Sequence, residues 1–292
     1  MGFEQILENA SLVKCLKKLP HVRQKERWDC GIACIEMILG GTKKNIDRNE
    51  ILDSISTQSI WTIDLALCLH EIGVHIIFLT NTVGPSTSYR LLDFYSKQLE
   101  QDSIRVNKRF IEAESTNLVI RKASVDICYM SELLSRDACV IIILLNRLLL
   151  PHHTSIGYSS LLWLIRGSTS YRGHYLILVG YCPENDAFVA RDPAVADDFV
   201  FLPSHTLDFA RKSFGTDEDL IVVDLSGEGI QLAEIRPNKG KFEWGDYFTK
   251  QNIIRYAKEA TILIKDSIQQ FLTNFGKCST SIKEQFKTKS VQ

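Results

Sequence analysis

The pattern of hydrophobic and polar positions predicts three helices and then a strand in the N-terminal part of the chain. An apolar run begins at Cys30 and stops at Gly40-Gly41, because glycine is common just past the end of a helix. Two more helices are expected at 48–56 and 62–71. Residues 74–80 alternate and are rich in β-branched side chains, which is typical of a strand.

Apolar runs further along predict the strands of a buried sheet. The segment 140–146 is apolar as far as Leu145 and is expected to be a buried strand. The runs 175–181 and 188–191 flank a Cys-Pro-Glu-Asn-Asp-Ala turn, so they are expected to pair as an antiparallel hairpin. A last strand at 220–225 completes the predicted fold, which is α+β with helices packed on an antiparallel sheet.

Three segments are expected along the chain. Residues 1–20 form an N-terminal leader segment, and residues 21–228 form one domain. The composition changes after Gly227, so 229–292 are expected to be a C-terminal extension. Its apolar stripe predicts an amphipathic helix over 253–275 that contacts the domain, a partner or a membrane surface, before a basic tail.

Composition and charge limit the kinds of partner and cellular compartment expected for this protein. The chain has 292 residues and a net charge of −1, which gives no electrostatic reason to expect a nucleic-acid partner. Its eight cysteines are irregularly spaced and several lie in apolar runs, which favours reduced thiols. The N-terminus lacks the apolar stretch of a signal peptide, and the most apolar segment is too short to span a membrane. We therefore expect a soluble, cytoplasmic protein with no transmembrane segment.

The stretch from Gln24 to Cys34 contains the candidate nucleophile. Cys30 stands where a helix begins, and the helix N-terminus stabilises a thiolate. Gln24 precedes it by six residues, so its amide can donate to the oxyanion of a tetrahedral intermediate together with the backbone N–H of Cys30. Cys34, one turn later, is expected to be a core residue.

The predicted hairpin supplies a base and a residue that orients it. His174 opens the first strand, and Asp192 ends the second, so the hairpin returns Asp192 to within a residue or two of His174. Asp192 is then expected to accept the Nδ1–H bond of the ring. Cys30, His174, Asp192 and Gln24 together form a candidate catalytic site.

No pattern in the sequence predicts a metal or a cofactor. The cysteines have no paired C-x-x-C spacing, and no glycine-rich phosphate loop is present. The acidic run 217–219 is expected to be a solvated turn before the last strand. Asp64 is expected to be an acid in the first turn of its helix.

These residues carry two resemblances. The order Gln24, Cys30 in Asp-Cys-Gly, His174 and Asp192 before proline resembles papain-like cysteine peptidases, in particular the leader peptidase domains of peptide-exporting ABC transporters. The chain is also similar, over about 21–226, to the guanylyl cyclase domain-containing protein family, which includes the plant soluble guanylyl cyclases. The motifs that carry this second resemblance are Trp28–Gly31, Ser59–Ala66, Arg105–Asn107, Gly173–Tyr175, Arg191–Ala194 and Ala210–Asp219.

Three functions follow as hypotheses. The residues favour a papain-like fold and a thiol hydrolase or peptidase, in which Cys30 attacks an amide or acyl carbonyl of a peptide or small acyl substrate. The family resemblance implies instead a guanylyl cyclase, which converts GTP to cyclic GMP with Mg²⁺ or Mn²⁺. A third hypothesis is a non-catalytic peptide-binding module with a vestigial triad.

Overall fold

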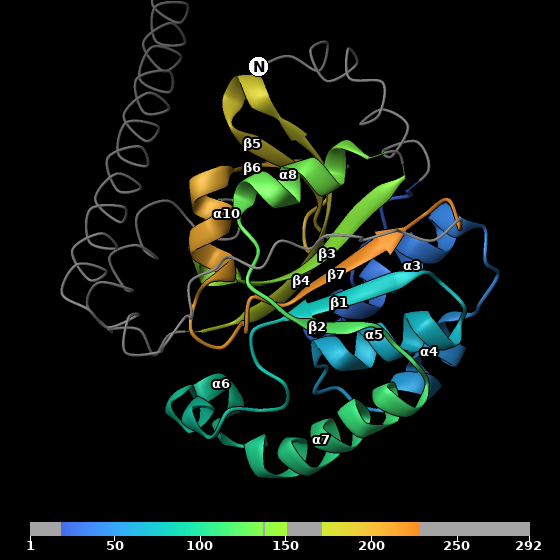
Figure 1. Cartoon of the computed structure of the whole chain (residues 1–292), viewed down its shortest axis with the longest axis vertical. Helices are drawn as coiled ribbons and strands as arrows, with labels where there is room; N and C mark the ends of the chain where they lie inside the picture. Colours follow the sequence, from blue (N-terminus) through green and yellow to red (C-terminus); the bar gives the residue numbers. More distant parts are fainter. Residues whose placement is uncertain (1–18, 137, 151–170, 228–292) are drawn as a thin grey trace, which may run out of the picture. The chain divides into compact units, whose positions relative to one another are not determined.

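A seven-stranded sheet organises the computed structural model, which describes residues 19–136, 138–150 and 171–227 (Figure 1). Its strand order is β2-β1-β7-β3-β4-β5-β6. The strands are β1 (Ile76–Thr80), β2 (Ile120–Lys122), β3 (Cys139–Asn146), β4 (Gly173–Cys182), β5 (Ala187–Arg191), β6 (Val200–Pro203) and β7 (Leu220–Asp224). Only the β1–β2 pair is parallel among these strands, so the sheet is mainly antiparallel, as predicted.

Helices cover both faces of this sheet. They are α3 (Cys30–Thr42), α4 (Arg48–Ile55), α5 (Thr62–Glu71), α6 (Asp93–Ser96), α7 (Leu99–Ser115), α8 (Ile127–Ser135) and α10 (Ser204–Arg211). In Figure 1, α3, α4 and α5 lie on one side of the sheet and α8 and α10 on the other. The α+β class is thus confirmed, and the helix that begins at Cys30 packs on the sheet.

Alternation along the strands produces two separate cores. In β4, Tyr175, Ile177 and Val179 join the core beneath α3 and α5, whereas Leu176 and Leu178 join the core beneath α8 and α10. Because both faces are covered, β1, β3, β5 and β7 are buried along their whole length. Continuous apolar runs, rather than alternating ones, therefore mark these strands.

One sequence prediction about local structure needs correction, and two features were not anticipated. Helix α3 passes through both glycines and ends at Thr42. A Cβ at Gly40 would lie 2.5 Å from the Pro20 ring, so this glycine serves close packing rather than helix termination. Leu19, assigned to the leader, is fully buried in the core. Strand β6 was not predicted.

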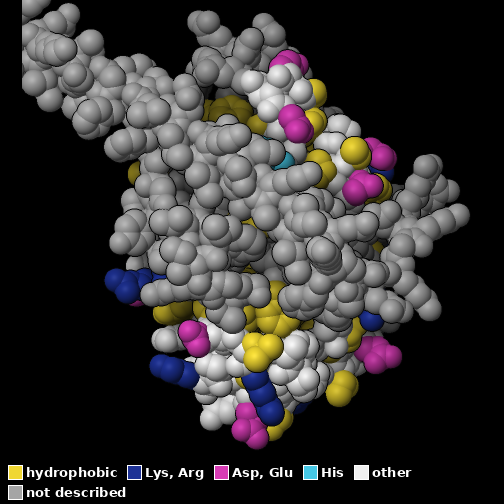
Figure 2. Space-filling model, turned by 90° about the vertical axis from the view of Figure 1, so that its left-hand side faces the viewer, with side chains coloured by type: hydrophobic (Ala, Val, Ile, Leu, Met, Phe, Trp, Pro, Cys, Tyr) yellow, Lys and Arg dark blue, Asp and Glu magenta, His cyan; other side chains and the backbone are white. Residues whose placement is uncertain are grey.

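The predicted tail helix at 253–275, like residues 1–18, lies outside the described residues. Among the residues that are described, no helix is both long and apolar enough to cross a membrane. On the face shown in Figure 2, the basic and acidic side chains of described residues are scattered among hydrophobic ones.

Candidate active site

Cys30 is the first residue of α3 and lies against the beginning of β4. Its side chain is buried, with 6% of its surface exposed. The sulfur accepts a hydrogen bond from the backbone N–H of Tyr175 at 3.5 Å. The thiol therefore sits at a helix N-terminus and faces a strand, where backbone N–H groups favour its charged form.

Asp29 shapes the loop before the helix instead of capping the helix with its side chain. Its carboxylate accepts the backbone N–H groups of Lys25 and Glu26 at 3.1 and 3.0 Å. It is fully buried and forms an ion pair with Arg48, which also pairs with Glu36 of α3. The carboxylate thus fixes the turn that leads from Gln24 to Cys30.

His174 and Asp192 form a buried pair behind the sulfur. His174 Nε2 lies 2.8 Å from Asp192 Oδ1, and both residues are at most 1% exposed. The prediction that Asp192 binds Nδ1 is therefore wrong, since Nε2 makes this contact. The ring is also hydrogen-bonded to the Cys30 thiol. Since Nε2 points to Asp192, Nδ1 is the nitrogen left for the sulfur.

The electrostatics of this pair favour a thiolate and an imidazolium. Burial alone raises the pKa of the Cys30 thiol, but the hydrogen bond and charge of His174 outweigh it and lower the pKa below its usual value. For His174, burial lowers the pKa, while the bonds to Asp192 and Cys30 raise it to about 9. Cys34, by contrast, is fully buried in the core as predicted, and burial raises its pKa well above normal.

Gln24 lies in the same pocket as Cys30, with its amide turned to its own loop. Nε2 donates to the carbonyl of Glu26 at 2.6 Å, and Oε1 is buried with no hydrogen-bond partner among the described residues. The backbone N–H of Gln24 donates to Pro193 O at 2.9 Å. This bond joins the loop of Gln24 to the segment that carries Asp192.

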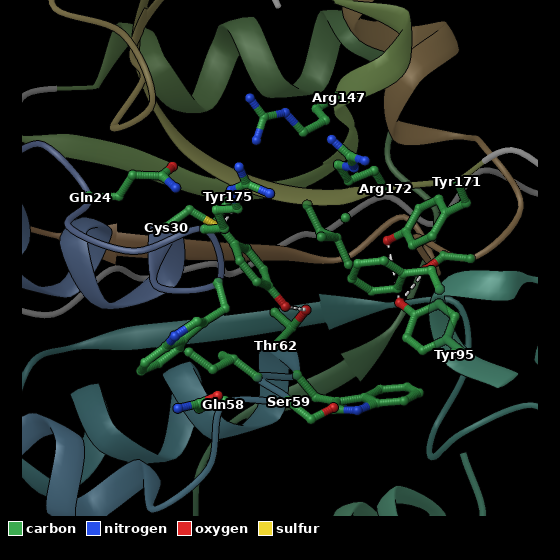
Figure 3. A pocket seen from close by; sticks show the side chains of 18 of the residues that line it. Gln24, Cys30, Gln58, Ser59, Thr62, Tyr95, Arg147, Tyr171, Arg172 and Tyr175 are labelled. Atoms are coloured by element: carbon green, nitrogen blue, oxygen red, sulfur yellow. Dashed lines mark hydrogen bonds between the residues drawn. The ribbon is translucent and has the colours of Figure 1, made fainter. Parts of the chain in front are cut away.

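A pocket of about 930 Å³ opens onto Cys30. His174 and Asp192 do not line it themselves, but Cys30, Gly173, Tyr175 and Ala194 beside them do. Several basic residues do line it, namely Arg23, Lys25, Arg27, Arg147 and Arg172. In Figure 3, Arg147 and Arg172 lie near each other beside the pocket, and Tyr175 extends from Cys30 toward Thr62.

The other end of the pocket is acidic and aromatic. Asp217 and Asp219 line it, and Asp219 is only 7% exposed. The predicted solvated turn at 217–219 is therefore wrong. Burial raises the pKa of Asp217 to about 6, and burial together with the charge of Asp217 raises the pKa of Asp219 well above normal.

Glu218, between these two acids, turns away and anchors the loop. It accepts bonds from Arg211, Ser124 and Asn81 at 2.7–2.9 Å. Arg211 is fully buried and also donates to the carbonyl of Val125. Asp217 and Glu218 both have positive φ, 51° and 53°, a conformation that costs energy in residues other than glycine.

Aromatic rings form the wall at the acidic end. The ring centroids of Trp61 and Tyr95 are 5.1 Å apart, and those of Tyr95 and Tyr171 are 5.5 Å apart. The Tyr95 hydroxyl donates to Gly215 O at 2.9 Å. Sequence reasoning missed this wall, because its rings come from three separate segments; the aromatic cluster around 89–95 was the available signal.

Asp64 has the role predicted for it, as an acid in the first turn of α5. It accepts the backbone N–H of Trp61 at 2.9 Å and pairs with Arg105 of α7 at 2.6 Å. Arg105 also donates to Ser59 O. The network therefore holds the segment that brings Trp61 to the pocket.

Within the described parts of the chain, no three His, Cys, Asp or Glu side chains are grouped so that they could hold a metal ion. Asp217 and Asp219 come nearest to such a group. The first is already bonded by Tyr89 and the second is buried with a raised pKa. Mg²⁺ is usually held by one or two carboxylates together with substrate phosphates and water, so these two acids are the candidate ligands for a metal that a bound nucleotide would bring.

Comparison with known proteins defines the family. The guanylylate cyclase family model matches residues 19–223. Guanylyl cyclase 1 of Arabidopsis thaliana is 35% identical over 208 residues, which are 71% of this chain and 76% of that protein. The chain belongs to this guanylylate cyclase family.

Solved structures add a remote likeness. A structure described as that of a C39-like peptidase from Bacillus anthracis covers 70% of this chain and 94% of its own, with 11% identity and a TM-score of 0.42. A likeness of this size carries no argument about the chemistry of the site.

Proposed function

We propose that this protein is a thiol acyl-transfer enzyme, a hydrolase or peptidase whose nucleophile is Cys30. The observation that carries the proposal is the contact of the Cys30 thiol with the His174–Asp192 pair at the head of a pocket. Lowered thiol pKa and raised imidazole pKa are what a nucleophile and its base need near neutral pH.

The reaction proceeds in two halves. The Cys30 thiolate attacks the carbonyl carbon of an amide or ester and forms the carbon–sulfur bond. The His174 imidazolium then gives its proton to the leaving amine or alcohol as the carbon–nitrogen or carbon–oxygen bond of the substrate breaks. Water then attacks the thioester, His174 accepts the proton of that water, and the carbonyl–sulfur bond breaks to release the acid and restore the thiolate. Asp192 keeps the ring oriented throughout.

The oxyanion of each tetrahedral intermediate lies at the N-terminus of α3 in this mechanism. The backbone N–H of Cys30 is one donor, and the amide of Gln24 is the second. Gln24 Nε2 is bonded to Glu26 O, so it exchanges this carbonyl for the oxyanion as the intermediate forms.

A second candidate is the conversion of GTP to cyclic GMP, which the family and the Arabidopsis relative carry in their names. The five basic residues at the pocket favour it, since arginine and lysine bind phosphates. Cyclisation uses the 3′-oxygen of GTP as nucleophile and a divalent metal on the triphosphate. Cyclisation makes no use of the Cys30–His174–Asp192 arrangement at the pocket, so GTP ranks second.

A third candidate is a peptide-binding module without catalysis. The observation that favours it is the burial of His174, which is 1% exposed and does not line the pocket. In such a module the buried His174–Asp192 pair has a structural role.

The test compares the wild type with Cys30→Ala and His174→Ala. Hydrolysis of an activated ester and, separately, cyclic GMP formation with Mg²⁺ or Mn²⁺ are measured in all three proteins. Cys128→Ala is the matched control, since Cys128 is an exposed cysteine on α8. We expect ester hydrolysis in the wild type and the control and its loss in the two site variants.

The same set of proteins separates the alternatives. Metal-dependent cyclic GMP formation that survives in Cys30→Ala would overturn the thiol mechanism, because cyclisation needs no enzyme nucleophile. Neither activity in any protein, together with slow alkylation of Cys30 by iodoacetamide, would favour the binding module.

A further inference from the structure

We propose that the acidic end of the pocket is a subsite for an organic cation, so that the preferred substrate carries an ammonium or guanidinium group on its acyl part. This inference names the substrate class of the proposed thiol acyl-transfer site and rests on it. Four observations support it.

The first is an unused acceptor. Asp219 lines the pocket and is only 7% exposed. Thr62 and Thr80 hydrogen-bond its carboxylate, but its Oδ1 has no hydrogen-bond partner among the described residues. A buried oxygen without a donor is costly. A ligand that brings an N–H into this end of the pocket removes that cost.

The second is the absence of a protein cation for these acids. Arg211, the nearest buried arginine in sequence, binds Glu218 and Asp208. In the described part of the chain no lysine, arginine or histidine forms an ion pair with Asp217 or Asp219. Burial raises both pKa values, and only hydroxyl hydrogen bonds oppose it, from Tyr89 and Thr82 on Asp217 and from Thr62 and Thr80 on Asp219. A cationic ligand would add the opposite charge that the described fold does not provide.

The third is the aromatic wall. Trp61, Tyr95 and Tyr171 line the pocket together with the two acids. Figure 3 shows Tyr95 and Tyr171 side by side, away from Cys30. Aromatic faces attract ammonium and guanidinium groups but offer no ligand to Mg²⁺. Rings and carboxylates together thus favour an organic cation.

The fourth is the distance from the nucleophile. The Tyr175 backbone N–H contacts Cys30 Sγ, and its hydroxyl lies 3.0 Å from Thr62 Oγ1. The Thr62 hydroxyl in turn stabilises the charged form of Asp219. One tyrosine side chain therefore spans most of the way from the sulfur to the acid. A lysine or arginine side chain is of similar length, so a basic residue whose carbonyl is at Cys30 reaches the acids.

Binding tests the subsite without any need for turnover. Nα-acetyl-lysine amide and its neutral analogue Nα-acetyl-norleucine amide are titrated by calorimetry into full-length Cys30→Ala protein, alone and combined with Asp219→Asn. Asp53→Asn is the matched control, an exposed acid on α4. We expect the lysine amide to bind about tenfold more tightly than the norleucine amide, and Asp219→Asn to remove this preference while Asp53→Asn keeps it.

Equal binding of the two amides to the Cys30→Ala protein, or no binding of either, would overturn the subsite. A preference that Asp219→Asn leaves intact in a folded protein would do so as well. The readout is independent of the proposed chemistry, because it uses a protein without the nucleophile. If the thiol is inactive but the lysine amide binds more tightly, the hydrolase proposal fails and the subsite stands. If the thiol is active but the two amides bind equally, the hydrolase proposal stands and the subsite fails.

Discussion

Asp192 and His174 are eighteen positions apart in the sequence, yet their side chains meet at 2.8 Å and are almost completely shielded from solvent. The strand pairing explains the contact. Arg191 lies opposite Ile177, and a bulge at Leu178–Gly180 shifts the register of the hairpin. Asp192 follows directly, on the segment that runs back beside the start of β4.

This contact predicts the effect of Asp192→Asn. Loss of the carboxylate removes the partner that raises the pKa of His174, so less imidazolium faces the sulfur and the pKa of Cys30 rises. We expect the rate of Cys30 alkylation by iodoacetamide at pH 6 to fall about tenfold, since one pKa unit changes the thiolate fraction tenfold. Mass spectrometry of the labelled peptide between pH 5 and 9 measures it. Asp197→Asn, at an exposed acid, is the control. An unchanged profile in Asp192→Asn would show that the pair does not tune the thiol.

Gln24→Ala tests the proposed oxyanion donor. Loss of one such donor lowers kcat by roughly a hundredfold to a thousandfold in related sites. We expect that fall in ester hydrolysis with no change in the alkylation rate of Cys30, because Gln24 is not among the groups that set the thiol pKa. Gln58→Ala, at another glutamine that lines the pocket, is the control. Equal loss in both variants would assign Gln24 to general pocket structure.

Part of this site was predictable from the sequence because its signals are local. The helix start at Cys30 follows from the apolar run behind it, and the hairpin follows from its turn residues. The ring nitrogen that meets Asp192 was not predictable, because it depends on the rotation of one side chain. The glycines at 40 and 41 were misinterpreted because the contact of Gly40 with Pro20 is not visible in a helical pattern.

The prediction for the acidic run 217–219 failed for a different reason. Three consecutive acids predict a solvated turn, since charges avoid burial unless they are paired. The partners of Glu218 are Asn81, Ser124 and Arg211, of which two are far away in the sequence. Only the folded sheet brings them together, so burial of the run could not be inferred from its own residues.

Arg211→Met tests how far this buried network stabilises the domain. The variant leaves the Glu218 carboxylate buried without its cation, which costs about 3–5 kcal/mol when one partner of a buried pair is removed. We expect the free energy of unfolding in urea to fall by that amount. Arg136→Met breaks the exposed pair with Glu132 and should cost at most about 1 kcal/mol. Similar losses in the two variants would contradict the role of the buried pair.

The raised pKa of Asp217 predicts that Asp217→Asn stabilises the protein, and that this gain in stability depends on pH. The folded pKa of Asp217 is about 6, above the usual 3.8, so the folded state holds its proton more tightly than the unfolded state. Protonated Asp217 therefore contributes stability that is fully present below about pH 4 and is lost as the pH rises through 6. Asparagine cannot ionise and tolerates the positive φ of this position.

We expect Asp217→Asn to be more stable than the wild type by about 1–2 kcal/mol at pH 7.5 and to lose that advantage at pH 4. Urea unfolding at the two pH values measures the difference. A gain that is the same at both would assign the effect to backbone conformation instead of ionisation.

Helix α3 has a consequence for how this protein can change over time. Glu36, Gly40 and Thr42 are its only residues that are not buried, so the helix that carries Cys30 is also part of the core. Substitutions along its length therefore alter packing and the position of the sulfur together, and selection on either property constrains the other. The single side chain of Cys30 is the exception, because its loss removes the nucleophile and leaves the helix in place. A lineage could in this way abandon the thiol chemistry in one step and still inherit the whole scaffold.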